Sequence, residues 1–381
     1  MRVLVTGGAG YVGSVSVERL VDAGHHVVVL DSLVTGHAAA VPDGARLVHD
    51  TLRDREALER LLRNEQIEAV LHCAARSLVG QSVVEPALYY RENVAGGIGL
   101  LDAMHAAGVH RLVFSSTAAV YGAAEIVPIL EDAPLAPINS YGETKRTFEG
   151  AMRWYGDAYG LRGVALRYFN VAGASERNGE QHDPETHLIP NVLAAALGHR
   201  ELTVFGTDYP TPDGSCIRDY IHVEDLADAH LAALQLTAGP PPDATPAPAP
   251  PGGGGGDRSA GVPGPDDRGP GERGDPDDRG PGERGDPGDH GPGVPGGLIV
   301  CNLGSGSGFS VLEVLRAAER VVGREIPRAI GPRRPGDPPV LVASNARARA
   351  LLGWTPRRGT LGEMIGSAWR WLETHPEGYR R

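Results

Sequence analysis

The feature that most limits the fold of this chain is a glycine-rich turn that follows directly on a short apolar segment near the N-terminus. Residues 3–5 predict a buried strand, the turn TGGAGYVGS covers residues 6–14, and residues 15–23 predict a helix. A second continuous apolar run, residues 27–30, is typical of a parallel strand that is buried on both faces. Strand, tight turn, helix and strand in this order predict the first βαβ unit of a doubly wound, Rossmann-like sheet.

The same alternation continues to about residue 170. The expected strands are residues 69–72, 111–115 and 164–168, and the expected helices are residues 53–64, 93–107 and 141–159. We therefore expect an α/β fold in which residues 1–169 form a Rossmann-like domain with right-handed crossovers. Residues 170–237 and 298–381 have a more irregular pattern and predict a smaller mixed α/β lobe for a substrate, with strands that return to the sheet.

Residues 238–297 have a composition unlike the rest of the chain. They hold 15 of the 31 prolines and 19 of the 53 glycines, with 11 acidic residues against 5 arginines. The unit DDRGPGERGDP occurs twice in succession, over 266–276 and 277–287. Proline and glycine disfavour helix and strand interiors, and the few apolar side chains cannot offset the entropy lost on ordering. A disordered insert is predicted, and a role in partner binding stays open.

Composition excludes several classes of protein. The 381 residues carry a formal charge of −12, which disfavours a nucleic-acid binder because such proteins present a basic surface. No apolar run approaches the roughly 20 residues of a membrane span, and the strand at residues 3–5 argues against a signal peptide. The 3 cysteines are too few for a disulfide framework and fit no zinc cluster, so no metal site is predicted. A cytoplasmic protein is expected.

The glycine-rich turn also predicts a ligand. Its glycines have the spacing GxxGxxG, which lets backbone amides approach a pyrophosphate at the start of a helix. Asp31 follows the second expected strand, where a carboxylate accepts hydrogen bonds from ribose hydroxyls and repels a 2′-phosphate. Together these features predict NAD rather than NADP as the cofactor. Asp50 and Asn93 are further candidate contacts, although each fits a helix cap equally well.

A tyrosine and a lysine stand four residues apart in the expected helix 141–159. Tyr141 and Lys145 then share one helix face, and Lys145 is the only lysine of the chain. An ammonium beside a phenol, together with a positively charged nicotinamide, favours the phenolate and makes the tyrosine a usable base. Thr117 follows the strand 111–115 at the carboxyl edge of the sheet, where its hydroxyl can bond a substrate oxygen.

With these motifs the chain resembles the extended short-chain dehydrogenases that act on nucleotide sugars, and within them the UDP-glucose 4-epimerase family. The resemblance covers the chain outside the insert. Besides the N-terminal turn, it rests on FSSTAAVYG at 114–122, SYGETK at 140–145, LRYFNVAGA at 166–174, HLIP at 187–190, VFGTDYPTPDGSCIRDYIHVEDLA at 204–227, NLGSGSG at 302–308 and RRPGD at 333–337.

This resemblance implies NAD-dependent epimerisation at C4 of a UDP-hexose, in which UDP-glucose and UDP-galactose interconvert through a transient 4-keto sugar. It implies that Tyr141 takes the proton of the 4-hydroxyl and that Thr117 holds that oxygen. Lys145 is implied to bind the nicotinamide ribose and to lower the pKa of the tyrosine. A homodimer joined through helices 93–107 and 141–159 is expected from the resemblance alone.

The resemblance assigns the site residues to two groups. Those implied to bind NAD are Gly7, Gly10, Tyr11, Val12, Gly13, Asp31, Ser32, Asp50, Thr51, Cys73, Ala74, Ala75, Asn93, Ser115, Tyr141, Lys145 and Phe169. Those implied to bind the UDP-sugar are Thr117, Asn170, His187, Leu188, Phe205, Arg218, Arg334, Asp337 and Leu341. Two arginines suit a diphosphate, because guanidinium forks match phosphate oxygens, and Arg333 is an alternative to its neighbour.

Three positions depart from the family pattern. Thr117 stands where many relatives have serine, and His187 stands where they often have asparagine. Leu341 falls where residue size influences the acceptance of N-acetylated sugars, so a UDP-N-acetylhexosamine or UDP-pentose 4-epimerase is an open alternative.

Two other functions are disfavoured. A nucleotide-sugar dehydratase normally has an acid directly after the catalytic threonine, where this chain has Ala118 and Ala119. A non-catalytic NAD-binding scaffold tends to lose the tyrosine or the lysine, and this chain keeps both.

Overall fold

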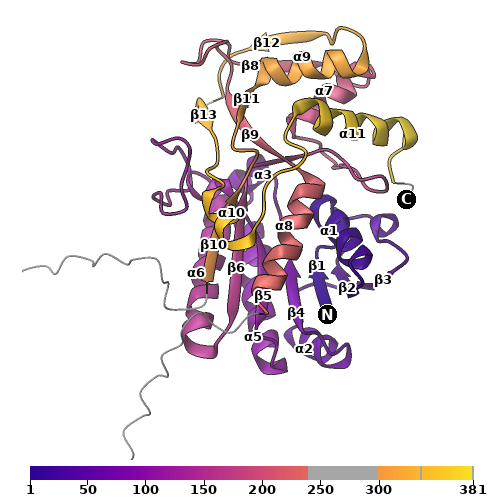
Figure 1. The fold of residues 1–381 in the computed structure, drawn as a ribbon, viewed down its shortest axis with the longest axis vertical. Coiled ribbons are helices and arrows are strands. Elements are labelled where there is room, and N and C mark those ends of the chain that lie inside the picture. The colour runs from indigo at the N-terminus through magenta and orange to yellow at the C-terminus, as the bar shows by residue number, and fades with distance from the viewer. Residues whose placement is uncertain (239–297, 335–336, 380–381) are drawn as a thin grey trace, which may run out of the picture. The chain divides into compact units, whose positions relative to one another are not determined.

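The structure, a computed structural model, describes residues 1–238, 298–334 and 337–379. Its largest element is a sheet of seven parallel strands in the order β10-β6-β5-β4-β1-β2-β3 (Figure 1). The strands are β1 (Arg2–Thr6), β2 (His26–Asp31), β3 (Ala45–His49), β4 (Ala69–His72), β5 (Arg111–Thr117), β6 (Arg162–Tyr168) and β10 (Leu298–Leu303). The predicted doubly wound α/β fold is confirmed. The segment 239–297, and with it nearly all of the predicted insert, lies outside the described residues.

Helices cover both faces of this sheet. Alternate strand residues point to opposite sides, and apolar side chains on both sides need cover from solvent. In β1, Val3 and Val5 pack against α1 (Tyr11–Asp22) and α8 (Val223–Leu236). Leu4 points to the other face. The helices on that face are α2 (Arg55–Asn64), α5 (Gly96–Ala107) and α6 (Ser140–Tyr159). The continuous apolar runs of the sequence are therefore explained by burial on both sides.

Two helix starts differ from the sequence prediction by more than two residues. The helix expected from residue 15 begins at Tyr11, so Gly13 lies inside its first turn and not in the loop before it. The helix expected from residue 93 is preceded by α4 (Pro86–Tyr89) and by a π-helical turn, Tyr90–Ala95, before α5 begins. A π-helical turn in a longer helix often marks a functional position.

A second group of elements follows β6. Strands β7 (Asn170–Ala172), β9 (Ile217–His222), β11 (Gly308–Ser310) and β13 (Val340–Leu341) form a mixed sheet, and β8 (Leu202–Phe205) pairs with β12 (Arg328–Gly331). Helices α7 (Leu188–Ala196), α9 (Val311–Val322) and α11 (Leu361–Thr374) share one apolar cluster with β7, β8, β9 and β11 (Figure 1). The shorter elements are α3 (Val79–Val84), α10 (Ala346–Leu352) and the 3₁₀ turns Ala38–Ala40 and Ala118–Val120.

A buried ion pair fixes α6 to the sheet. Nε and Nη2 of Arg167, in β6, donate to the two carboxylate oxygens of Glu149, in α6, at 3.0 and 2.6 Å. The hydroxyl of Ser116, in β5, donates to the same carboxylate at 2.5 Å. The two charged side chains are only 4% and 5% exposed. Water therefore solvates neither charge, and each is stabilised by the other.

Replacing one member of this pair should be costly. We expect Glu149→Gln to lower the free energy of unfolding by about 3 kcal/mol, because it leaves the Arg167 charge buried without a counter-ion. Urea unfolding followed by circular dichroism measures this change. Glu143→Gln, at an exposed pair with Arg146 on the same helix, is the matched control and should cost about 0.5 kcal/mol or less. Equal losses in the two variants would contradict the structural role of the buried pair.

Candidate active site

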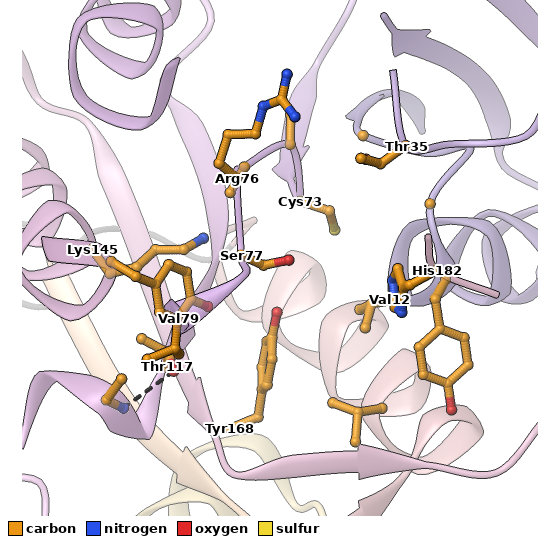
Figure 2. Close-up of a pocket in the computed structure, with 18 of the residues that line it drawn as sticks. Val12, Thr35, Cys73, Arg76, Ser77, Val79, Thr117, Lys145, Tyr168 and His182 are labelled. Carbon is orange, nitrogen blue, oxygen red and sulfur yellow. Dashed lines mark hydrogen bonds between the residues drawn. The ribbon is translucent and has the colours of Figure 1, made fainter. Parts of the chain in front are cut away.

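A cavity of about 770 Å³ lies along the carboxyl ends of the parallel strands. Asp31, Thr117 and Tyr168, which line it, are the last residues of β2, β5 and β6. In Figure 2, Thr117 and Lys145 lie on one side of the cavity, Val12 and His182 lie on the opposite side, and Cys73 lies between them. The cavity therefore joins the glycine-rich turn to the Tyr-Lys helix.

The glycine-rich segment that leads from β1 into the first turn of α1 has room for glycine alone at two positions. Gly7 has φ +72°, and a Cβ on it would lie 2.5 Å from the amide nitrogen of Ala74 in the loop after β4. A Cβ on Gly13 would collide with the carbonyl oxygen of Gly7. No side chain caps the start of α1, and its first turn holds no acidic residue. The N-terminus of α1 is thus open to an anion.

Asp31 has the environment expected of a ribose-binding carboxylate. One of its oxygens accepts from the amide of Ala9 at 2.9 Å and the other from the amide of Leu33 at 2.8 Å. These bonds fix the carboxylate, and each oxygen keeps a lone pair for a further donor. A glycine cradle that a Cβ would fill, an uncapped helix start and a fixed carboxylate together fit a dinucleotide with free ribose hydroxyls.

The three predicted catalytic side chains come together at the other side of the cavity. Gly142 lets α6 pack tightly on the turn after β5, since a Cβ there would lie 2.5 Å from the carbonyl oxygen of Ala119. Tyr141, Lys145 and Thr117 all line the cavity. Nζ of Lys145 donates to the carbonyl oxygen of Ser115 at 2.7 Å and lies 5.9 Å from the centre of the Tyr141 ring.

The tyrosine of the ligand-free protein is a weak acid. Burial raises the pKa of Tyr141 to about 12, and the Thr117 hydroxyl opposes this rise only in part. The predicted lowering of this pKa by the lysine and a bound nicotinamide concerns the cofactor-bound protein and stays a prediction. Desolvation dominates, because the ammonium is held on the Ser115 carbonyl and not on the phenol oxygen.

The pKa of the lysine is shifted in the opposite direction, downward. Burial lowers the pKa of Lys145 to about 8, while the Cys73 and Glu149 side chains act to raise it. Its ammonium also lies 4.6 Å from the centre of the Phe114 ring, a cation–π distance. At neutral pH the positive charge of Lys145 is thus stabilised by only a few close partners.

The residues assigned to the UDP-sugar lie beside this group. Asn170, His187, Arg218, Arg334, Asp337 and Leu341 all line the cavity. Arg218 forms an ion pair with Asp337, and the Arg334 guanidinium lies 4.2 Å from the centre of the Phe205 ring. The neighbouring Arg333 pairs instead with Asp208 at 2.7 Å. Of the two adjacent arginines, Arg334 is therefore the one on the cavity wall.

Four predicted residues do not line the cavity. Ser115 is buried, with its hydroxyl 3.0 Å from Nε2 of His230, and it contributes its carbonyl oxygen to Lys145. Asn93, in the π-helical turn, bonds the backbone nitrogen and oxygen of Arg76 at 2.8 and 3.0 Å and so positions the cavity loop after β4. Leu188 is the first residue of α7, and Phe205 ends β8 beneath Arg334.

The structure adds cavity residues that sequence reasoning missed. They include Arg76, Tyr168, Glu180 and His182. Tyr168 could have been found, because it ends a predicted strand at the same edge as Thr117. The other three lie in loops, and a loop has no periodic sequence pattern from which the position of a side chain could be predicted.

Comparison with known proteins assigns the family. Residues 3–245 match the family described as NAD dependent epimerase/dehydratase family. The chain belongs to this family. Over its whole length it is 44% identical to the UDP-glucose 4-epimerase of Lactobacillus helveticus, of which the match covers 99%.

Solved structures in this family have the same fold. The UDP-glucose 4-epimerase of Brucella ovis in complex with NAD matches with a TM-score of 0.80 and 38% identity over 97% of both chains. That of Bifidobacterium longum in complex with NAD+ and UDP matches with a TM-score of 0.79 and 31% identity over 100% of both chains. Among the described residues, no helix is long and apolar enough to cross a membrane.

The glycine cradle gives a direct test of cofactor binding. We expect Gly13→Ala to weaken NAD binding about tenfold or more, because the added methyl group pushes the turn away from its present shape. Gly150→Ala, in α6, is the matched control, since a Cβ there meets nothing within 4 Å. Isothermal titration of NAD into nucleotide-free protein measures both affinities. Equal affinity in the two variants would contradict the cradle.

The single lysine allows its pKa to be measured directly. In protein labelled with 13C-lysine and freed of nucleotide, the one side-chain resonance should titrate with a midpoint at about 8, because burial disfavours the ammonium. In urea the same resonance should titrate near the ordinary value of about 10.4. A midpoint in the folded protein equal to that in urea would show that Lys145 is not desolvated.

Proposed function

We propose that this chain interconverts UDP-glucose and UDP-galactose by NAD-dependent epimerisation at C4 through a transient 4-keto sugar. The observation that carries this proposal is one cavity whose wall holds the cofactor turn, the Tyr141–Lys145–Thr117 group and a pair of arginines. Relatives 41–44% identical over nearly the whole chain, named UDP-glucose 4-epimerase, support the same reaction.

Bound in the turn, NAD would supply the hydride acceptor and donor at C4 together with a positive charge beside the phenol. Tyr141 would take the proton of the sugar 4-hydroxyl and return it after the sugar has presented its other face. Because burial raises the pKa of this phenol to about 12, it needs a nearby positive charge to act as a base at neutral pH. Thr117 would hold the same sugar oxygen by a hydrogen bond.

In this reaction the lysine would position the nicotinamide ribose and supply a positive charge near Tyr141. Its bond to the Ser115 carbonyl fixes the ammonium on the Tyr141 side of the cavity, where it can donate to the nicotinamide ribose. Arginine is a poor substitute there, because its planar guanidinium is bulkier than an ammonium and is harder to deprotonate. This accounts for the one lysine in a chain that otherwise uses arginine for positive charge.

The nucleotide end of the substrate would be held by the second group of elements. Arg218 and Arg334 offer guanidinium forks to the diphosphate, and the ring of Phe205 supports Arg334 from below. Asn170 and His187 are further candidate donors, and Leu341 would limit the space next to the sugar. The two residues that follow Thr117 on the cavity wall are alanines, which supports epimerisation over dehydration.

We also propose that two copies of the chain associate through the surface formed by α5 and α6. Trp154 and Tyr159, both in α6, are 70% and 48% exposed. Large aromatic side chains exposed on one helix favour a protein partner over solvent. A second copy of this chain is the partner that the family resemblance favours.

Removing one oxygen atom tests the reaction. Tyr141→Phe should lower the rate of conversion of UDP-galactose to UDP-glucose about 100-fold or more, because it deletes the acid–base group, and it should keep its bound NAD. Tyr90→Phe, at an exposed tyrosine that does not line the cavity, is the control and should keep full activity. Chromatography of the two sugars as they approach equilibrium, with UDP-N-acetylgalactosamine in parallel, gives the rates and the substrate breadth. Full activity in Tyr141→Phe would remove the tyrosine from the mechanism.

A further inference from the structure

The segment between β7 and α7 gathers four potential metal ligands. Glu180, His182, Glu185 and His187 each offer one donor atom, and these four atoms all lie within 4.8 Å of one another. We call these four residues the 180–187 cluster. Its spacing, Glu-x-His-x-x-Glu-x-His, contains no cysteine and gave no sign of a metal site in the sequence.

Several distances in the 180–187 cluster are close to the edge lengths of a tetrahedral site. Nδ1 of His182 lies 3.3 Å from Oε1 of Glu180 and 3.5 Å from Oε2 of Glu185, and Nδ1 of His187 lies 3.4 Å from the other Glu185 oxygen, Oε1. Zinc bonds to nitrogen and oxygen are about 2.0–2.1 Å long, which separates the donor atoms of a tetrahedron by about 3.3–3.4 Å. An ion would have to widen the 2.5 Å separation of His187 and Glu180, and it would use one of the two Glu185 oxygens.

The ligands are also oriented from outside the cluster. The Glu185 carboxylate accepts from the backbone amides of Thr186 and His187 at 2.7 and 2.8 Å. The ring of Tyr11, in α1, meets the ring of His182 edge-on at 6.4 Å, and its hydroxyl donates to the Gly173 carbonyl at 2.6 Å. Such supporting contacts hold ligands in place before a metal binds.

Without a metal, two imidazoles and two carboxylates can neutralise one another, and one atom leaves that arrangement incomplete. Nδ1 of His187 lies at hydrogen-bond distance, 2.5 Å, from Glu180. Nδ1 of His182 is buried and lies at ion-pair distance from both carboxylates, but it makes no hydrogen bond to any described residue. A buried nitrogen without a partner is costly unless a ligand completes it.

We propose that the 180–187 cluster binds one divalent cation of the zinc class, with Nδ1 of both histidines and one oxygen of each glutamate as ligands. Four nitrogen and oxygen donors in a tetrahedron suit Zn²⁺ and Co²⁺ and do not suit Mg²⁺, which requires octahedral oxygen ligands.

The site would lie at the wall of the large cavity. Glu180, His182 and His187 line that cavity, as Figure 2 shows for His182. Ligation through Nδ1 leaves the Nε2 hydrogen of His187 free to donate to a ligand in the cavity. The cation would also neutralise two carboxylates that otherwise repel an anion, and it would fix the segment that links β7 to α7. The proposal does not depend on which reaction the cavity catalyses.

Metal titration of the NAD-containing, full-length chain without a histidine tag tests this proposal. After dialysis against a chelator, calorimetric titration with Zn²⁺ at mildly alkaline pH should give one tight equivalent per chain. Mildly alkaline pH is used because the carboxylates outweigh burial and raise the pKa of His182 to about 9 and of His187 to about 10, so binding releases protons. Co²⁺ should give the intense visible absorption of four-coordinate cobalt at the same stoichiometry.

Variants locate the site. His182→Gln and Glu180→Gln should each weaken the tight equivalent at least tenfold, and His199→Gln, at an exposed histidine beyond α7, should retain it. If the first two variants fold poorly, the thermal unfolding temperature of the unaltered protein should still rise and saturate at one Zn²⁺ per chain. The absence of a tight equivalent, its persistence in His182→Gln, or cobalt spectra of six-coordinate type would overturn the proposal.

Discussion

All seven strands of the main sheet run in the same direction, and the site depends on this constraint. Parallel strands deliver their carboxyl ends to one edge, so the turn after β1, Asp31 at the end of β2 and Thr117 at the end of β5 meet there despite their distance in sequence. Helix α6 joins them because the buried Arg167–Glu149 pair fixes it against β6. Tyr141 and Lys145 are thus held at the cavity by a contact whose two residues do not line it.

Burial sets the chemistry of this edge. It acts on both members of the Tyr-Lys pair, raising the pKa of the phenol to about 12 and lowering that of the ammonium to about 8. Both shifts favour the uncharged forms, so the ligand-free pair resists the ionisation that proton transfer requires. A bound oxidised nicotinamide would place a positive charge beside the phenol. The phenolate would then be available as a base only while the cofactor is in the oxidised state, which links proton removal to hydride removal.

Sequence patterns predicted the site residues whose placement depends on the geometry of a single helix or strand. The pairing of Tyr141 with Lys145 follows from helix periodicity, and the place of Asp31 follows from the end of a continuous apolar strand. Long-range contacts were not predictable in the same way. The sequence gives no sign that the Ser115 carbonyl holds the lysine, or that Asn93 positions the loop at Arg76, because those contacts depend on packing between elements. The 180–187 cluster was missed for the same reason, since an irregular segment has no period to read.

The described chain on either side of residues 239–297 shows why so long a segment can stand at this place. Thr237, just beyond α8, accepts from Nε of Arg111 at 3.2 Å, and Arg111 is the first residue of β5. Leu298 begins β10 and pairs with Gly163 near the start of β6. Both attachment points therefore lie at the amino ends of the strands, whereas the cavity lies at their carboxyl ends. We therefore expect a change in the length of this segment to leave the residues that line the cavity in place.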